Sequence, residues 1–146
     1  MNTNISLSHR KQEPESSVLY IVGTPIGNLD DISARALNIL KNVSMIACED
    51  TRTTSKLLNH FNISNILISF HKYSSSKKSE FLIKKLLEGS SIALVSDAGM
   101  PLISDPGELL VKEVKKKDID VICIPGPCAA LTALITSGLE SSKFTF

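Results

Sequence analysis

Short apolar runs rich in valine and isoleucine recur along the chain. They occupy residues 18–22, 43–48, 66–70, 91–95 and 119–124. None of them alternates regularly with polar residues, a pattern typical of strands that are buried on both faces of a parallel sheet. Their starts lie 23 to 28 residues apart, which leaves room for one strand, one helix and two short loops in each unit.

The segments between these runs have helical periodicity. The expected helices cover residues 31–41, 51–61, 76–87, 106–117 and 129–137. The fourth begins with Asp105 as a cap and Pro106 in its first turn. The last is apolar almost all round, so we expect it to be buried. The alternation of strand and helix predicts an α/β fold, a mostly parallel five-stranded sheet with helices on both faces.

The two ends of the chain depart from this pattern. Residues 1–17 contain no apolar segment and are rich in polar residues, which predicts a disordered leader and not a secretory signal. Residues 144–146 have the composition of the start of a further strand. We therefore expect residues 18–146 to be the N-terminal lobe of a longer protein whose C-terminal lobe is absent from this chain.

Composition narrows the class of protein. Hydrophobic residues make up 42% and charged residues 21%, as in soluble globular proteins, and no apolar run approaches the ~18 residues of a membrane helix. The net charge of +1 neither indicates nor excludes a nucleic-acid binder that uses a local patch. Cys48, Cys123 and Cys128 are odd in number and form no C-x-x-C pair. This favours a cytoplasmic protein without a disulfide framework or a metal site.

Glycine and proline gather directly after the apolar runs. Residues 23–28, 97–107 and 125–128 hold five of the six prolines and five of the seven glycines. A fourth run ends in the sequence Glu-Asp-Thr-Arg at residues 49–52. Turn chemistry explains one such loop alone. The carboxyl ends of parallel strands share one edge of the sheet, where open α/β proteins bind ligands, so four such loops predict a ligand site there.

The first loop does not match a known phosphate-binding motif. Pro25 stands where a G-x-G-x-x-G fingerprint needs its second glycine, and no lysine follows Gly27 as in a P-loop. Tight triphosphate binding is therefore not indicated. Exposed backbone near a helix start can still hold a small polar ligand.

The acidic residues after the strands have alternative interpretations. Asp97 either caps a turn or accepts hydrogen bonds from a hydroxyl or an ammonium of a ligand. Glu49 and Asp50 either cap the helix from residue 51 or position a substrate, and Asp50 can also pair with Arg52. Cys128 has no histidine nearby for nucleophilic catalysis, which indicates a packing or ligand-contact residue.

Together these segments resemble the signatures of the ribosomal RNA small-subunit methyltransferase I family, in the same order. They are LYIVGTPIGNL at 19–29, EDTR at 49–52, SDAGMPLISDPG at 96–107 and IPGPCA at 124–129. The resemblance covers the chain from Val18 to Phe146. This sequence has Met100 where the family usually has threonine and Cys128 where it usually has serine, so two hydroxyls are missing near the expected cofactor.

The family is similar to the tetrapyrrole methylases, which bind S-adenosylmethionine between two α/β lobes. The resemblance implies 2′-O-methylation of a cytidine ribose in the decoding region of 16S rRNA in the 30S subunit, by a homodimer that needs no metal. The implied cofactor contacts are Pro25, Ile26, Gly27, Val95, Ser96, Asp97, Met100, Cys128 and Ala129.

Such a reaction requires a ribose hydroxyl aligned with the methyl group and a group that takes the hydroxyl proton. The candidates for this work are Asn28, Glu49, Asp50 and Arg52. Two other hypotheses remain open. One is a methylase of the same fold that acts on a small molecule such as a tetrapyrrole. The other is a non-catalytic dimerisation or binding lobe, whose apolar last helix would be exposed.

Overall fold

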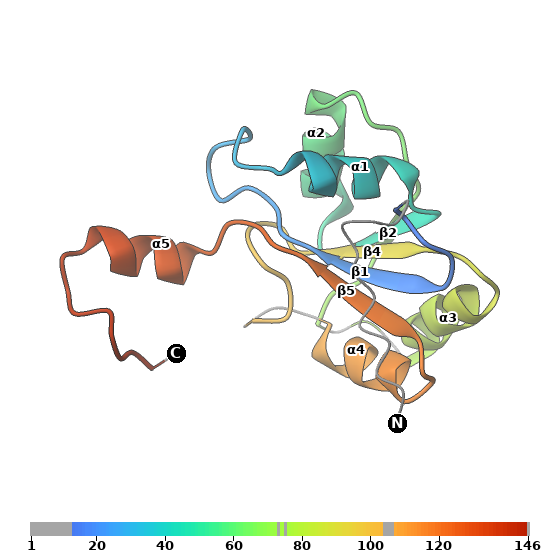
Figure 1. Ribbon diagram of the computed structural model, residues 1–146. Coiled ribbons are helices and arrows are strands. Elements are labelled where there is room, and N and C mark those ends of the chain that lie inside the picture. The colour runs from blue at the N-terminus through green and yellow to red at the C-terminus, as the bar shows by residue number, and fades with distance from the viewer. Residues whose placement is uncertain (1–12, 73, 75, 104–106, 146) are drawn as a thin grey trace.

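A five-stranded parallel sheet forms the centre of the protein (Figure 1). The computed structural model describes residues 13–72, 74, 76–103 and 107–145. The strands are β1 (Val18–Val22), β2 (Met45–Cys48), β3 (Leu67–Ser69), β4 (Ile92–Val95) and β5 (Asp120–Ile124). Their spatial order is β3-β2-β4-β1-β5, and every neighbouring pair is parallel. Each expected run contains one strand, so the predicted sheet is confirmed.

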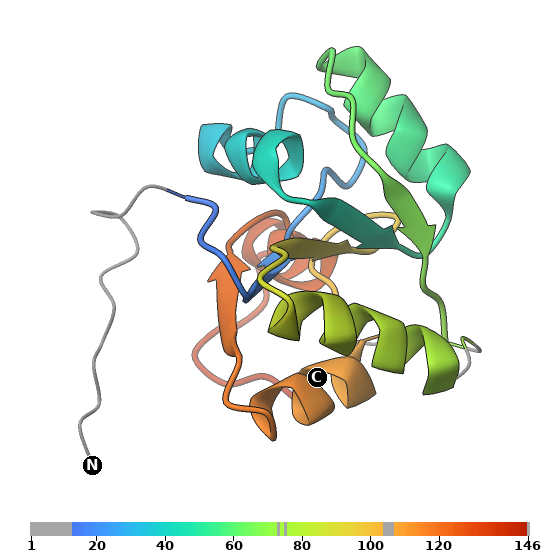
Figure 2. The same ribbon diagram turned by 90° about the vertical axis from the view of Figure 1, so that its right-hand side faces the viewer.

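Helices cover both faces of the sheet, as predicted. The helices of the chain are α1 (Ala34–Asn42), α2 (Thr51–His60), α3 (Ser76–Leu87), α4 (Glu108–Lys115) and α5 (Ala129–Thr136), of which the first four cover the sheet. Helices α1 and α2 lie on one face and α3 and α4 on the other, and a view along the sheet separates these layers clearly (Figure 2). Helix α1 begins three residues later than expected because Ser33 is its N-cap and accepts a hydrogen bond from the Ala36 N–H. The predicted cap Asp105 and first-turn Pro106 lie outside the described residues.

Successive residues of the central strands point into two separate cores. Tyr20 and Val22 of β1 pack with α1 and α2, whereas Leu19 and Ile21 pack with α3 and α4. Strands β1, β2 and β4 are buried throughout. The expectation of burial on both faces is wrong for β3 and β5, which are partly exposed because each forms an edge of the sheet and has a neighbour on one side only.

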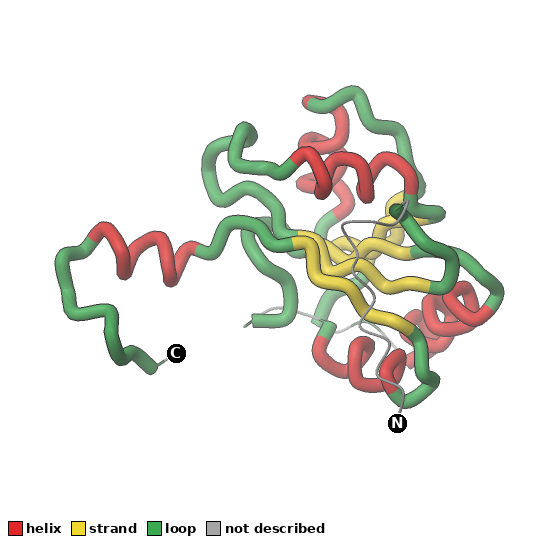
Figure 3. Tube along the Cα trace, in the orientation of Figure 1, coloured by secondary structure: helices red, strands yellow, loops and turns green. Residues whose placement is uncertain are grey.

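Helix α5 departs most from the sequence prediction. The expected buried helix instead projects away from the sheet (Figure 3), and none of its residues is buried. Leu131 is 47% exposed and Ile135 is 75% exposed. An apolar pattern gives a helix a preference for burial, but the described residues of this chain provide no surface that covers it. Residues 144–145 form no strand, and Phe146 lies outside the described residues.

The segment before β1 is attached to the fold. Glu13 forms an ion pair of 2.6 Å with Arg35 of α1, and the Glu15 N–H donates to the Tyr20 hydroxyl at 2.8 Å. The Ser16 hydroxyl donates to the Gly89 carbonyl at 2.9 Å. Residues 13–17, which we expected in a disordered leader, are therefore held against the fold, while residues 1–12 lie outside the described part. Within that part, no helix has the length and apolar character needed to span a membrane.

Candidate functional site

The chain reverses its direction of winding at the centre of the sheet. From β2 it continues to α2 on one face, whereas from the adjacent β4 it continues to α4 on the other face. The loops that follow these two strands therefore diverge and leave a crevice at the carboxyl edge, the usual ligand position in open α/β folds. The loops after β1, β2, β4 and β5 meet at this edge, as their sequence positions predicted.

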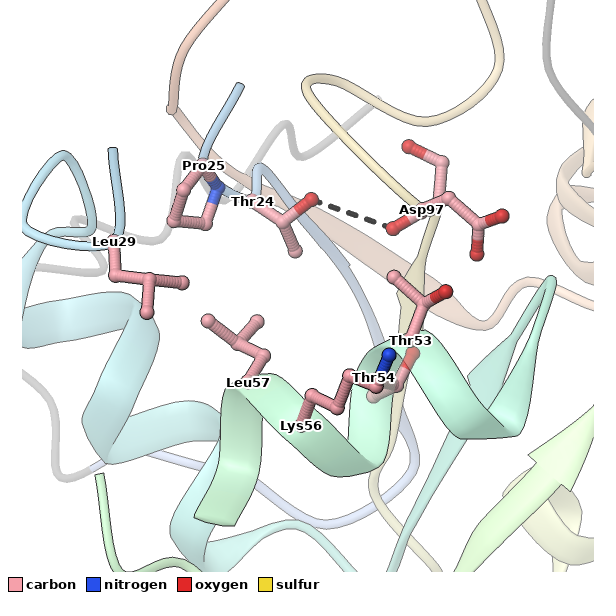
Figure 4. Close-up of a pocket in the computed structure, with 9 residues that line it drawn as sticks. Thr24, Pro25, Leu29, Thr53, Thr54, Lys56, Leu57 and Asp97 are labelled. Atoms are coloured by element: carbon pink, nitrogen blue, oxygen red, sulfur yellow. Dashed lines mark hydrogen bonds between the residues drawn. The ribbon is translucent and has the colours of Figure 1, made fainter. Parts of the chain in front are cut away.

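Backbone hydrogen bonds join the loop after β1 to the loop after β4. Thr24 and Gly99 exchange two of them, each with an N···O distance of 3.0 Å. The buried Thr24 hydroxyl also donates to the Ser96 carbonyl at 3.3 Å (Figure 4). These bonds fix the two loops relative to each other, although they are more than 70 residues apart in the sequence.

The loops after β1 and β5 pack backbone to backbone. The Gly23 N–H donates to the Ile124 carbonyl at 3.2 Å. A Cβ atom on Gly23 would lie 2.6 Å from the Gly126 Cα and 2.7 Å from the Met100 Sδ. No real Cβ tolerates such distances, so this approach requires glycine at both positions.

The loop after β2 is held by two carboxylates. The Asp97 Oδ1 accepts from the Asp50 N–H at 3.1 Å and so connects the loops after β4 and β2. Asp50 itself is the N-cap of α2, and its Oδ1 accepts from the Arg52 N–H at 2.8 Å. Its carboxylate also accepts from Arg52 Nε at 3.1 and 3.2 Å and from Nη2 at 2.6 Å. The cap and ion-pair interpretations of Asp50 are both confirmed.

Hydrogen bonds from Arg52 lower the pKa of Asp50. The hydrogen bonds from the Arg52 side chain, followed by the bond from its backbone N–H, lower the pKa of Asp50 from its ordinary 3.8 to about 2. The same pair raises the pKa of Arg52. A carboxylate with such a low pKa and with both oxygens engaged is a weak proton acceptor.

A cavity of about 200 Å³ lies between the loop after β1, the end of β4 and helix α2. Its walls are Thr24, Pro25, Leu29, Thr53, Thr54, Lys56, Leu57, Ser96 and Asp97. Figure 4 shows Pro25, Leu29 and Leu57 on one side of this cavity and Thr53 and Asp97 on the other. The combination of an apolar wall with a few convergent polar groups is typical of small-molecule sites.

The other predicted cofactor residues are spread along the same edge. Ile26 borders a second hollow of about 430 Å³, which reaches Pro125, Gly126 and Pro127 before α5. Gly27 is exposed, and a Cβ added to it would meet no atom within 4 Å. The Val95 side chain is buried in the core, so only its backbone can face a ligand.

The structure places the four predicted catalytic residues in three different surroundings. Glu49 borders a third hollow of about 450 Å³, together with residues of α3 and α4, and is apart from the cavity beside α2. The Asn28 Oδ1 accepts from the Asp30 N–H at 3.1 Å and so stabilises its own turn. Asp50 and Arg52 engage each other. Of the described residues, no group of three or more His, Cys, Asp or Glu side chains is arranged to hold a metal ion.

The comparison with known families identifies the fold. The family model of tetrapyrrole (corrin/porphyrin) methylases matches residues 18–145. The chain belongs to this family. Two solved structures of 18–19% sequence identity share the tetrapyrrole methylase fold. Diphthine synthase has a TM-score of 0.70 over 88% of this chain and 51% of its own. Uroporphyrin-III-C-methyltransferase from Thermus thermophilus has a TM-score of 0.63 over 87% of this chain and 54% of its own.

More similar relatives of this chain bear the name that the sequence motifs suggested. Ribosomal RNA small subunit methyltransferase I from Vibrio cholerae is 57% identical over 129 residues, which are 88% of this chain and 45% of that protein. The protein of the same name from Halalkalibacterium halodurans is 53% identical over 136 residues, 93% of this chain and 47% of that protein. The resemblance is confirmed, and the chain spans about half the length of these relatives.

The two departures from the motifs have local consequences in this chain. The Met100 sulfur packs over Gly23, at the junction of three loops. Cys128 is the N-cap of α5 and makes no side-chain hydrogen bond there. Serine at this position would have a hydroxyl that accepts from the first turn, so the cysteine leaves α5 without a side-chain cap. Ala129, the first residue of α5, is exposed.

Sequence reasoning missed the part of the cavity that α2 provides. Thr53, Lys56 and Leu57 of α2 line it, whereas the predicted residues of this helix end at Arg52. A usable signal was present, because residues three and four positions apart in a helix share a face. Extending this spacing from Thr53, one residue after the predicted Arg52, leads to Lys56 and Leu57.

Proposed function

We propose that this chain is part of an S-adenosylmethionine-dependent methyltransferase that methylates the 2′-hydroxyl of a cytidine in 16S rRNA. The observation that carries the proposal is the convergence of four loops at the carboxyl edge. Hydrogen bonds join Thr24 to Gly99 and Asp50 to Asp97, and so connect the loops after β1, β2 and β4. The printed names of the relatives favour rRNA of the small ribosomal subunit as the substrate.

The residues at this edge fit the chemistry of the cofactor. The exposed Asp97 carboxylate suits a ribose hydroxyl or an ammonium group, and Pro25 and Leu57 provide apolar contacts. We assign the remaining contacts to Ile26, Gly27, Val95, Ser96, Met100, Cys128 and Ala129. A cavity of about 200 Å³ is smaller than the ~300–1,000 Å³ of typical ligand sites, so this lobe would contribute only part of the pocket.

When bound, the cofactor would supply an electrophilic methyl group. The residues of this chain must then hold the ribose hydroxyl in line with it, since alignment of the reacting atoms can lower a barrier by up to about 7–11 kcal/mol. A positive charge disappears from sulfur in the transition state, so a carboxylate at sulfur would stabilise the ground state instead. Asp97 is therefore assigned to a polar end of the cofactor.

The proton of the attacking hydroxyl needs an acceptor. Asp50 is unsuited because Arg52 occupies its carboxylate, and the Asn28 oxygen is used within its own turn. We therefore assign the role to neither of them, and Glu49 is the other carboxylate of the predicted catalytic group. Arg52, which remains charged, is assigned to substrate binding and not to proton transfer.

We further propose that the protein acts as a cytoplasmic homodimer on the 30S subunit. Helix α5 supports a protein contact, because it carries no charged residue and exposes Leu131 and Ile135. Exposed apolar patches of this kind mark interaction surfaces in soluble proteins.

The test combines binding and transfer. Calorimetric titration of S-adenosylmethionine into this chain should give saturable heat, and NAD should give none. Binding should weaken in Asp97→Ala. In a chain extended to the full length of the relatives, labelled methyl should enter 16S rRNA of 30S particles as an alkali-resistant 2′-O-methylcytidine. Labelling of a free tetrapyrrole in place of the particles would contradict the proposed substrate, and saturable binding of NAD would contradict the proposed reaction.

A further inference from the structure

Asp97 lies in the crevice between the ends of β2 and β4, where it contacts a residue 47 positions away in the sequence. Its Oδ1 accepts from the Asp50 N–H at 3.1 Å, while the residue also lines the cavity beside α2. We propose that Asp97 is a positioning residue, which fixes the turn after β2 and thereby orients the Arg52 guanidinium relative to the cavity. The proposal deepens the function inferred above and rests on it for the identity of the substrate.

The first step of this arrangement is the bond between the two loops. Asp50 is the last residue before α2, so its N–H lies outside the helical hydrogen-bond pattern and needs another acceptor. The Asp97 carboxylate supplies that acceptor from the neighbouring strand end. Without it, the turn would depend only on the bonds that Asp50 makes to its own helix.

The second step is the fixed orientation of Arg52. Its side chain is 86% exposed, and an exposed arginine normally samples many rotamers. Here Nε and Nη2 both donate to the Asp50 carboxylate, whose Oδ1 is also bonded to the Arg52 N–H. This forked pairing restricts the guanidinium and leaves Nη1 and one Nη2 hydrogen directed away from Asp50. These remaining donors suit a phosphate of an RNA strand.

The third step connects Arg52 with the contents of the cavity. Thr53, which follows Arg52, and Asp97 both line the cavity. A ligand that hydrogen-bonds to the Asp97 carboxylate changes the strength of the bond that this carboxylate accepts from the Asp50 N–H. Cofactor binding would therefore be transmitted to Arg52 through one side chain and one backbone amide.

Amide hydrogen exchange of this chain, measured by NMR, tests the proposal without any substrate. Asp97→Ala should speed exchange of the Asp50 N–H by at least about fivefold, the factor expected when one hydrogen bond is lost. The Arg52 Nε–H should also exchange faster. Asp97→Asn keeps an acceptor oxygen and should stay within about twofold of the parent. Asp30→Ala, which removes a carboxylate from the same edge, is the matched control and should have no effect.

Two further observations separate the steps. Asp50→Asn keeps the backbone N–H but weakens the pair, so the Arg52 Nε–H should exchange faster while the amide of residue 50 is unchanged. Core amides of Leu94 and Ile46 report on the integrity of the fold and should not change in any variant. Unaltered exchange at Asp50 in Asp97→Ala, or equal acceleration in Asp97→Ala and Asp97→Asn, would overturn the positioning role.

Titration with S-adenosylmethionine distinguishes this proposal from the proposed function. In the parent chain, the Arg52 Nε–H and Thr24 signals should shift with the same dissociation constant. In Asp97→Ala, which breaks the bond to the Asp50 N–H, the Arg52 shift should be lost or reduced at saturation. A chain that shows the expected exchange pattern but no shift with the cofactor would retain the positioning role, and the proposed methyltransferase function would then be the part that fails.

Discussion

The loops around β1, β2 and β4 and the segment that follows β5 lie at the same edge of the sheet, yet they differ in how they are held. The central loops are joined by the Thr24–Gly99 bridge and by the bond from Asp50 to Asp97. Among the described residues, helix α5 makes no comparable bond to another loop, and none of its residues is buried. Helices α4 and α5 both have eight residues and two leucines. The difference between them shows that an apolar pattern favours burial but does not determine which surface covers the helix.

The largest expected effect comes from one substitution made in both helices. Leu110 and Leu131 are the third residues of α4 and α5, and Leu110 is 0% exposed whereas Leu131 is 47% exposed. Leu110→Ala should lower the free energy of unfolding by about 2–5 kcal/mol, because it creates a cavity in the core. Leu131→Ala should change it by less than about 0.5 kcal/mol. Urea denaturation monitored by circular dichroism measures both.

The paired design controls for helix propensity, since both variants replace leucine by alanine at the same helical position. A loss above about 2 kcal/mol in Leu131→Ala would show that α5 is packed in solution and would remove the contrast between the two regions. Dependence of that loss on protein concentration would identify a second copy of the chain as the packing partner.

The contact between the loops after β1 and β5 should give the next largest effect. Gly23→Ala places a Cβ 2.6 Å from the Gly126 Cα, so the backbone must shift, at a cost of about 1–3 kcal/mol in the free energy of unfolding. Gly138→Ala is the control, because its Cβ meets no atom within 4 Å and only its φ of 74° is strained. Thermal unfolding should rank Gly23→Ala as the more destabilised, and the opposite order would contradict the packing described here.

A smaller effect is expected at the bridge between the loops after β1 and β4. Thr24→Val keeps the shape of the buried side chain but removes the hydroxyl that donates to the Ser96 carbonyl. The loss of this long hydrogen bond should cost about 1 kcal/mol in urea denaturation. Thr53→Val removes an exposed hydroxyl from the opposite wall of the cavity and should leave stability within about 0.5 kcal/mol. Equal losses in the two variants would show that the hydrogen bond is unimportant.

Most of the fold follows from local patterns. Buried strands and amphipathic helices leave periodicities in the sequence, so all ten elements were expected at nearly their observed positions. Burial of β3, β5 and α5 was overestimated, because it depends on which strands form the edges and on what covers a helix. Those are long-range properties, and the apolar runs at residues 66–70 and 129–137 do not encode them locally.

The sequence predicted the position of the candidate site more accurately than the roles of its residues. Parallel strands place all their carboxyl ends at one edge, so the meeting of the four loops followed from the topology. The contacts of the individual site residues did not follow from the topology. That Asp97 accepts from the Asp50 N–H, and that Glu49 borders a different hollow, depends on side-chain directions that differ between strand ends and have no periodic signal.

The smallest effect concerns the exposed pair of Asp50 and Arg52, and it depends on pH. The pKa of Asp50 is about 2 in the folded chain against an ordinary 3.8. A carboxyl whose pKa is lowered by folding stabilises the fold above its unfolded pKa, and this contribution disappears as the pH falls from about 4 to 2. Arg52→Gln should therefore lower the melting temperature slightly at pH 6 and not at pH 2. By carboxyl NMR, Asp50 should titrate near pH 2 in the parent and closer to 3.8 in Arg52→Gln. Titration of the parent at its ordinary pKa would show that the fork does not persist in solution and would make this loop as loosely held as α5.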